Sequence, residues 1–118
     1  MVGGCSMANY QNVVPLRLGQ AAITTGYTTV YTVPAATRTY IKDFDISNTT
    51  AATVYIYVSI VPTLGTAGTA NALFYSNALP ANTTIQWTGS QVMMTGDTLQ
   101  VKASGTGCTI TASGGEAT

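Results

Sequence analysis

The sequence of 118 residues contains no histidine and few charged residues of either sign. Charged residues make up 7% of the chain, against about 25% in an average soluble domain. Four basic residues balance four acidic ones, so the formal net charge at neutral pH is zero. Proteins that bind nucleic acid usually carry a basic surplus, so this balance argues against a nucleic-acid partner.

The absence of histidine removes the commonest general base and the commonest metal ligand. Neither a G-x-S-x-G nucleophile elbow nor a glycine-rich phosphate loop is present. The one acidic cluster, Asp43 with Asp45 beside Lys42, is typical of a solvated strand face and not of a hydrolytic pair across a cleft. Asp97 follows Thr95-Gly96 and is predicted to fix a turn. We therefore expect no enzyme, no catalytic residue, no cofactor and no metal site.

Cysteine is also scarce, with only Cys5 and Cys108. Two cysteines are too few for a disulfide framework, and their spacing matches no zinc motif. Cys108 alternates with Ile110, which favours a small buried hydrophobic residue over a disulfide partner.

Long hydrophobic runs are missing. No stretch of 18 or more apolar residues exists, so no membrane-spanning helix and no membrane partner is expected. The opening Met1-Val2-Gly3-Gly4-Cys5 weakly resembles a lipoprotein site, but it lacks the charged and apolar regions of a signal peptide.

The residues that are abundant favour β-structure. Threonine is the commonest residue, and β-branched side chains favour strands. Turn residues such as Pro34, Pro80 and Gly96 separate short alternating segments. The pattern predicts an all-β antiparallel sandwich or barrel, with strands over residues 22–33, 37–47, 52–61, 72–75, 83–87, 98–104 and 108–112.

The first twenty residues differ from the rest of the chain. They mix glycine, asparagine and glutamine with one short apolar patch, formed by Val13, Val14, Leu16 and Leu18. This weak patterning predicts an extended N-terminal arm over residues 1–20, with one strand near its end, followed by a β-sandwich domain over residues 21–118. We expect the arm to order against another surface.

Alternation predicts which faces of the strands are buried. In segment 52–61 the apolar face contains Val54, Ile56, Val58 and Ile60, so Tyr55 and Tyr57 lie on the opposite face. In segment 37–47 Lys42 shares a face with Tyr40, Phe44 and Ile46, and Ile41 shares the other face with Asp43 and Asp45. Trp87 alternates with Ile85, which predicts a core position; a sugar-stacking platform is the alternative.

The tyrosines and the low charge together suggest contact with a partner. Tyr55 and Tyr57 are amphipathic side chains that pack against another sheet, a neighbouring subunit or a sugar, or stand as ordinary surface residues. A surface with so little charge risks self-association unless an assembly covers it. A structural role in a symmetric assembly is therefore expected.

Five segments resemble a family of small tailed-bacteriophage virion proteins and occur in that family's order; they are residues 28–35 (TTVYTVPA), 46–54 (ISNTTAATV), 79–84 (LPANTT), 95–101 (TGDTLQV) and 109–116 (TITASGGE). The resemblance extends from Ala21 to Glu116. The resemblance implies a jelly-roll-like β-sandwich and a structural role, with no catalytic residues.

The resemblance implies a capsid decoration, or cement, protein. We expect a homo-oligomer, favouring a trimer, that binds major capsid proteins at capsomer junctions in a virion assembled in the bacterial cytoplasm. A neck, tail or fibre-base component and a carbohydrate-binding module for host recognition are the alternatives. The residues predicted to contact partners are Val13, Val14, Leu16, Leu18, Tyr55 and Tyr57.

Overall fold

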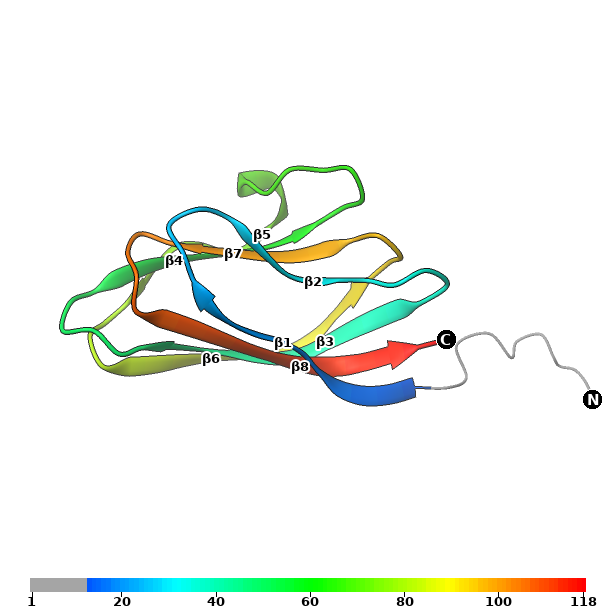
Figure 1. Cartoon of the computed structure of the whole chain (residues 1–118), viewed down its shortest axis with the longest axis horizontal. Helices are drawn as coiled ribbons and strands as arrows, with labels where there is room; N and C mark the ends of the chain where they lie inside the picture. The colour runs from blue at the N-terminus through cyan, green and yellow to red at the C-terminus, as the bar shows by residue number, and fades with distance from the viewer. Residues whose placement is uncertain (1–12) are drawn as a thin grey trace, which may run out of the picture.

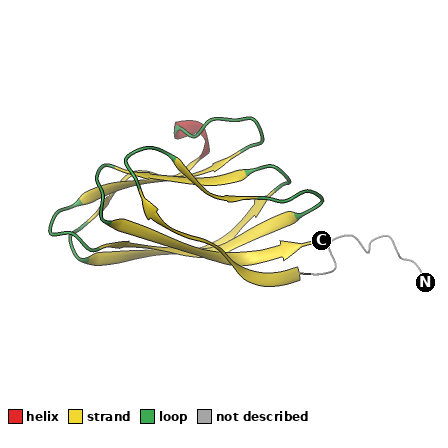
Figure 2. Ribbon diagram, in the orientation of Figure 1, coloured by secondary structure: helices red, strands yellow, loops and turns green. Residues whose placement is uncertain are grey.

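The computed structural model describes residues 13–118 as two four-stranded antiparallel sheets stacked face to face (Figure 1). The only helical segment among these residues is the short 3₁₀ helix η2 (Thr69–Asn71), and Figure 2 shows strands and loops elsewhere. The predicted all-β sandwich is confirmed. Its strands are β1 (Val13–Ile23), β2 (Thr28–Thr32), β3 (Arg38–Asn48), β4 (Val54–Val61), β5 (Ala72–Leu79), β6 (Thr83–Met93), β7 (Thr98–Ala103) and β8 (Cys108–Ala117).

The strand order identifies the sandwich as a jelly roll. One sheet has the order β1-β8-β3-β6 and the other has the order β2-β7-β4-β5. Consecutive strands therefore change sheets at every connection except the one between β4 and β5. Eight strands wound in this way form the two-sheet jelly roll, which agrees with the fold that the sequence resemblance implies.

The predicted boundary after residue 20 falls inside β1. This strand pairs with β8 from Val13 opposite Ala117 to Ile23 opposite Cys108, with one irregularity between Arg17 and Gly19. Residues 13–20 are therefore part of the first sheet, because their backbone groups bond to β8. Residues 1–12, which make up the rest of the predicted arm, lie outside the described residues.

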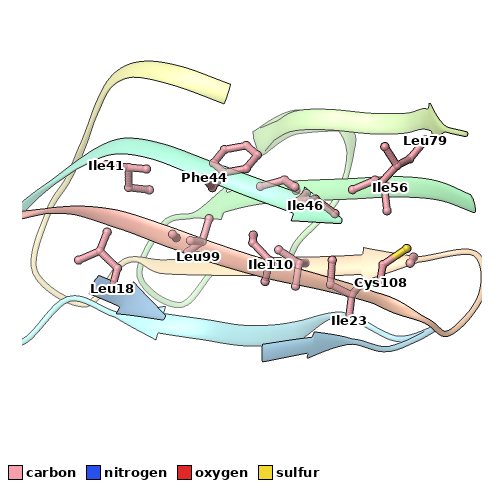
Figure 3. Packing of buried hydrophobic residues seen from close by; sticks show 14 of the residues in the cluster. Leu18, Ile23, Ile41, Phe44, Ile46, Ile56, Leu79, Leu99, Cys108 and Ile110 are labelled. Atoms are coloured by element: carbon pink, nitrogen blue, oxygen red, sulfur yellow. The ribbon is translucent and has the colours of Figure 1, made fainter. Parts of the chain in front are cut away.

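The core lies between the two sheets and consists of aliphatic side chains around Phe44 (Figure 3). Its most completely buried members include Ile41, Phe44, Ile46, Ile56, Leu99 and Ile110. Each fully buried side chain of this kind contributes about 1.5–3 kcal/mol, so the core outweighs any contribution from the few charges. Cys108 is buried with a free thiol, as its alternation with Ile110 predicts, and burial raises its pKa.

The predicted faces of β3 are wrong in the first half of that strand. A bulge lies between Ile41 and Asp43 in the pairing of β3 with both of its neighbours. The extra residue, Lys42, reverses the alternation, so Ile41 joins Phe44 in the core while Tyr40 turns outward. Simple period-two counting cannot anticipate this change of phase.

Candidate interaction surfaces

The acidic side chains of the described residues do not gather into a metal-binding cluster. Among residues 13–118 no group of three or more histidine, cysteine or acidic side chains could hold a metal, and no helix is long and apolar enough to cross a membrane. The Asp97 carboxylate accepts hydrogen bonds from the backbone N–H groups of Thr63 (3.1 Å) and Met94 (2.9 Å). Asp97 therefore fixes two loops, which confirms its predicted turn role.

The outer face of the β2-β7-β4-β5 sheet carries exposed tyrosines. Tyr55 is 45% exposed and Tyr75 is 54% exposed. The rings of Tyr57 and Tyr75 meet edge to face, with centroids 5.0 Å apart. The Lys102 ammonium group lies 4.6 Å from the centroid of Tyr57 and 5.2 Å from that of Tyr27. We call this group of four tyrosines and Lys102 the tyrosine surface.

The local sequence explains why these rings point outward. Val54, Ile56 and Val58 fill the core from one side of β4, so the intervening Tyr55 and Tyr57 take the other side. Lys102 is directly opposite Tyr57 on β7, and its amine lies within cation–π range of the Tyr57 ring. One part of the Tyr57 ring is thus already occupied, whereas Tyr55 and Tyr75 remain open to a partner.

A groove of about 390 Å³ lies on the outer face of the β1-β8-β3-β6 sheet. Its floor contains Gly115, which is directly opposite Tyr40 on β3 and Pro15 on β1. A Cβ atom on Gly115 would lie 3.2 Å from the Val13 side chain, so the missing side chain helps to keep the groove open. We call it the β1 groove; its lining residues are Val13, Pro15, Tyr40, Lys42, Ser90, Gly114 and Gly115.

The structure separates the residues that the sequence predicts as partner contacts. Val13 and Val14 are 56% and 57% exposed, and Val13 lines the β1 groove. Leu18 is only 7% exposed and belongs to the core, and Leu16 packs against that core. The apolar patch of the predicted arm is therefore divided between exposed side chains at the start of β1 and core-facing side chains further along it. Alternation separates Val13 from Leu16, whereas Val14 lies on the same face as Leu16 and is exposed at the start of the strand.

The two outward groups of predicted contacts lie on opposite faces of the molecule. Tyr55 and Tyr57 are on the outside of one sheet, and Val13 is on the outside of the other. Sequence reasoning missed Tyr40 as a groove residue because the bulge at Lys42 reverses its direction. It also missed Tyr75, which is close to Tyr57 only because β5 pairs with β4.

Trp87 lies at the margin of the core. Its indole is half-buried and stacks on Phe44, with centroids 5.2 Å apart and an interplanar angle of 14°. Phe44 also meets Phe74 edge to face at 5.4 Å. Trp87 therefore packs against the core as the alternation predicts, although β6 is an edge strand and leaves the indole partly open to solvent.

A polar contact ties the two sheets together near the ends of β2 and β8. The Tyr31 hydroxyl donates a hydrogen bond to the Glu116 carboxylate and shares a second hydrogen bond with the Thr39 hydroxyl at 2.7 Å. Burial, followed by the bond to Glu116, raises the pKa of Tyr31 to about 12. This contact is structural, because it joins β2 of one sheet to β3 and β8 of the other.

No protein-family model and no curated protein matches this chain. Solved structures of similar fold include a chain in the structure of infectious bursal disease virus, Gx strain, with a TM-score of 0.51 and 13% identity over 90% of this chain and 32% of that one. A chain of the T13 viral particle of infectious bursal disease virus has a TM-score of 0.50 and 13% identity, over 99% of this chain and 33% of that one.

The similarity is one of fold. This chain spans about a third of the length of these two solved chains. The similarity shows that a jelly-roll sandwich like this one also occurs in chains of a virus particle.

Proposed function

We propose that this protein is a structural component of a virus particle and acts by shape and contact. The observation that carries the proposal is the jelly-roll sandwich, similar in fold to chains of virus particles, with apolar surfaces on two opposite faces. A charged fraction of 7% agrees with a surface that is covered in an assembly. We propose a role without catalysis, which agrees with a sequence that lacks histidine, the commonest general base.

Within that role we infer a capsid decoration protein of a tailed bacteriophage. The sequence resemblance supports this finer assignment. It also supports our proposal that the virion is assembled in the bacterial cytoplasm. A trimer over a capsomer junction would use one face against the major capsid protein and another against neighbouring copies or capsomers. Binding only to the assembled shell would stabilise that shell by mass action, and linked contacts would add through effective concentration.

The contact residues that we propose are the exposed members of the predicted set. Val13 lines the β1 groove, Val14 is exposed next to it in the sequence, and Tyr55 and Tyr57 belong to the tyrosine surface. Apolar and aromatic contacts are weakly screened by salt, unlike contacts between exposed charges. Attachment to the particle should therefore survive high salt.

Reconstitution tests this function. Particles made without the protein would be mixed with the purified chain, sedimented, and imaged by electron cryomicroscopy. We expect the chain to sediment with the shells at low and at high salt, and Tyr55→Ala with Val13→Ser to weaken binding. Thr109→Ala, on an exposed part of the central strand β8, is the matched control. A protein that never binds shells, or that salt alone releases, contradicts the proposal.

A neck, tail or fibre-base component is the second location that we consider. The fold and surfaces suit either place, so copy number separates the two: hundreds of copies per particle support a decoration protein, and about a dozen support a tail part. The exposed rings of Tyr55 and Tyr75 also suit a carbohydrate-binding module for host recognition. A glycan array that gives a signal lost in Tyr55→Ala would favour that alternative.

A further inference from the structure

Among residues 13–118, the strand β6 forms one edge of its sheet, and the first part of this edge is regular and uncharged. It is 11 residues long and lies at the end of the order β1-β8-β3-β6. From Thr83 to Met93 it contains no charged residue and no proline, the two residue classes that commonly block an edge. The edge β1 of the same sheet carries both Pro15 and Arg17.

The edges of the other sheet are less suited to accept a strand. The strand β2 has five residues and a register shift between Thr29 and Tyr31. The strand β5 has two register shifts against β4, and its Ser76 has a φ of 54°. The regular part of β6 runs from Thr83 to Thr88, before its own bulge opposite Lys42.

The side chains of β6 form two uniform rows. Thr84, Gln86 and Thr88 are exposed on the outer face of the sheet. Ile85 and Trp87 face the core but remain half-buried, because no strand of residues 13–118 lies beyond β6 to cover them. A further strand added to this edge would extend the sheet and cover both apolar side chains.

We propose that β6 pairs antiparallel with β6 of a second copy, around a two-fold axis at Gln86. In this register Ile85 of each copy is opposite Trp87 of the other, and Thr84 is opposite Thr88. Aromatic with β-branched pairs and threonine pairs are among the favourable cross-strand combinations. The result is one continuous eight-stranded sheet across the two copies.

A second copy fits this edge better than a charged partner strand does. A two-fold axis pairs two identical strands, so any charge on the strand would lie near the same charge of the second copy and repel it. β6 carries no charge, so this repulsion is absent. The contact does not depend on the virion role. It is also separate from the trimer proposed above, since a two-fold contact would join one trimer to the next.

The tryptophan provides a direct readout, because Trp87 is the only tryptophan of the chain. We expect its emission to shift to shorter wavelength as protein concentration rises, because pairing covers the indole. Light scattering should show the mass doubling over the same concentration range. A mass and an emission that stay constant from micromolar to millimolar protein overturn the proposal.

Single cysteines test the register, in a background where Cys5→Ser leaves the buried Cys108 as the one native cysteine. Directly opposite Cα atoms in an antiparallel pair are about 4.5–5.5 Å apart, which a disulfide can span. Under a mild oxidant we expect Gln86→Cys to form a covalent dimer. Thr84→Cys should form one only when mixed with Thr88→Cys, and Gln20→Cys on the edge β1 is the control. Equal cross-linking at Gln20 would refute the proposed register.

Charge added to β6 tests the contact by weakening it. The double variant Thr84→Lys/Thr88→Lys places lysines opposite each other twice across the two-fold axis. We expect the dimer dissociation constant to rise at least about tenfold at low salt, because like charges directly opposite destabilise a strand pair. Thr109→Lys/Thr111→Lys adds the same charge to the central strand β8 and should leave the dimer dissociation constant unchanged. Equal weakening by both variants would mean that net charge alone, and no β6 contact, governs association.

Discussion

Phe44 and Trp87 are directly opposite each other on β3 and β6, and their rings stack with centroids 5.2 Å apart. Phe44 is completely buried at the centre of the core, whereas Trp87 covers it from the edge strand and stays half-buried. One aromatic pair therefore links the core to the free edge of the sheet.

The first prediction concerns this pair. Phe44→Ala should lower the free energy of unfolding by about 3–5 kcal/mol, because it leaves a cavity where two aromatic neighbours pack. Trp87→Ala should cost less, since the indole is already partly solvated. A double-mutant cycle by urea unfolding should give a coupling of about 0.5–1.5 kcal/mol. Strict additivity would show that the stacking adds nothing beyond burial.

The second prediction concerns Gly114, which is opposite Ile41 at the bulge of β3. A Cβ atom there would clash with the carbonyl oxygen of Tyr40, so the backbone would have to move. Gly114→Ala should therefore destabilise the fold by about 1–3 kcal/mol, in the range of overpacking. Gly26→Ala, where nothing lies within 4 Å of the added atom, is the control for thermal melting. Equal melting temperatures for the two variants would contradict the close approach.

The third prediction concerns Asn48, a buried polar residue at the end of β3. Its Nδ2 donates to the carbonyl oxygens of Ala52 (2.8 Å), Leu79 (3.0 Å) and Pro80 (3.2 Å), and its Oδ1 accepts from the Thr50 N–H (2.9 Å). Asn48→Ala leaves buried groups without partners, at a cost of about 1–3 kcal/mol for each.

Asn48→Asp should be at least as harmful as Asn48→Ala, because it turns a carboxylate toward three carbonyl oxygens. Chemical denaturation of both variants measures the effect. Asn82→Gly, in an exposed turn where φ is 55°, serves as the control. Near-native stability in Asn48→Asp would show that water replaces the network.

The fourth prediction is a dependence of stability on alkaline pH. Burial and the bond to Glu116 raise the pKa of Tyr31 from 10.0 to about 12, so the folded state holds this proton more tightly than the unfolded chain does. Its contribution is complete below the unfolded pKa and is lost as pH rises from about 10 toward about 12.

Urea unfolding at about pH 8 and about pH 11 measures this loss. Both arms carry Cys108→Ala, because the pKa of that buried thiol is also raised. At the lower pH the Tyr31→Phe variant should be less stable than its parent. It should also lose less stability than its parent between the lower and the higher pH. An identical loss in both proteins would place the alkaline sensitivity elsewhere.

The chain's alternation and turn residues were sufficient to predict the all-β class and the outward direction of Tyr55 and Tyr57. They also predicted the turn role of Asp97. These features depend on residues close together in the chain: a strand alternates every two residues, and Asp97 accepts a hydrogen bond from the N–H of Met94, three residues before it. The second bond to Asp97, from the distant Thr63, was not predicted.

Pairing between distant segments decided the rest. β8 draws residues 13–20 into the sheet and buries Leu18, and the bulge at Lys42 exchanges the directions of Tyr40 and Ile41. β6 extends to Met93 because its polar second half pairs with the first half of β3, although it lacks an apolar repeat of its own. A bulge and the choice of a partner strand depend on two distant segments of the chain that meet in the fold. The sequence pattern of either segment alone therefore does not specify them.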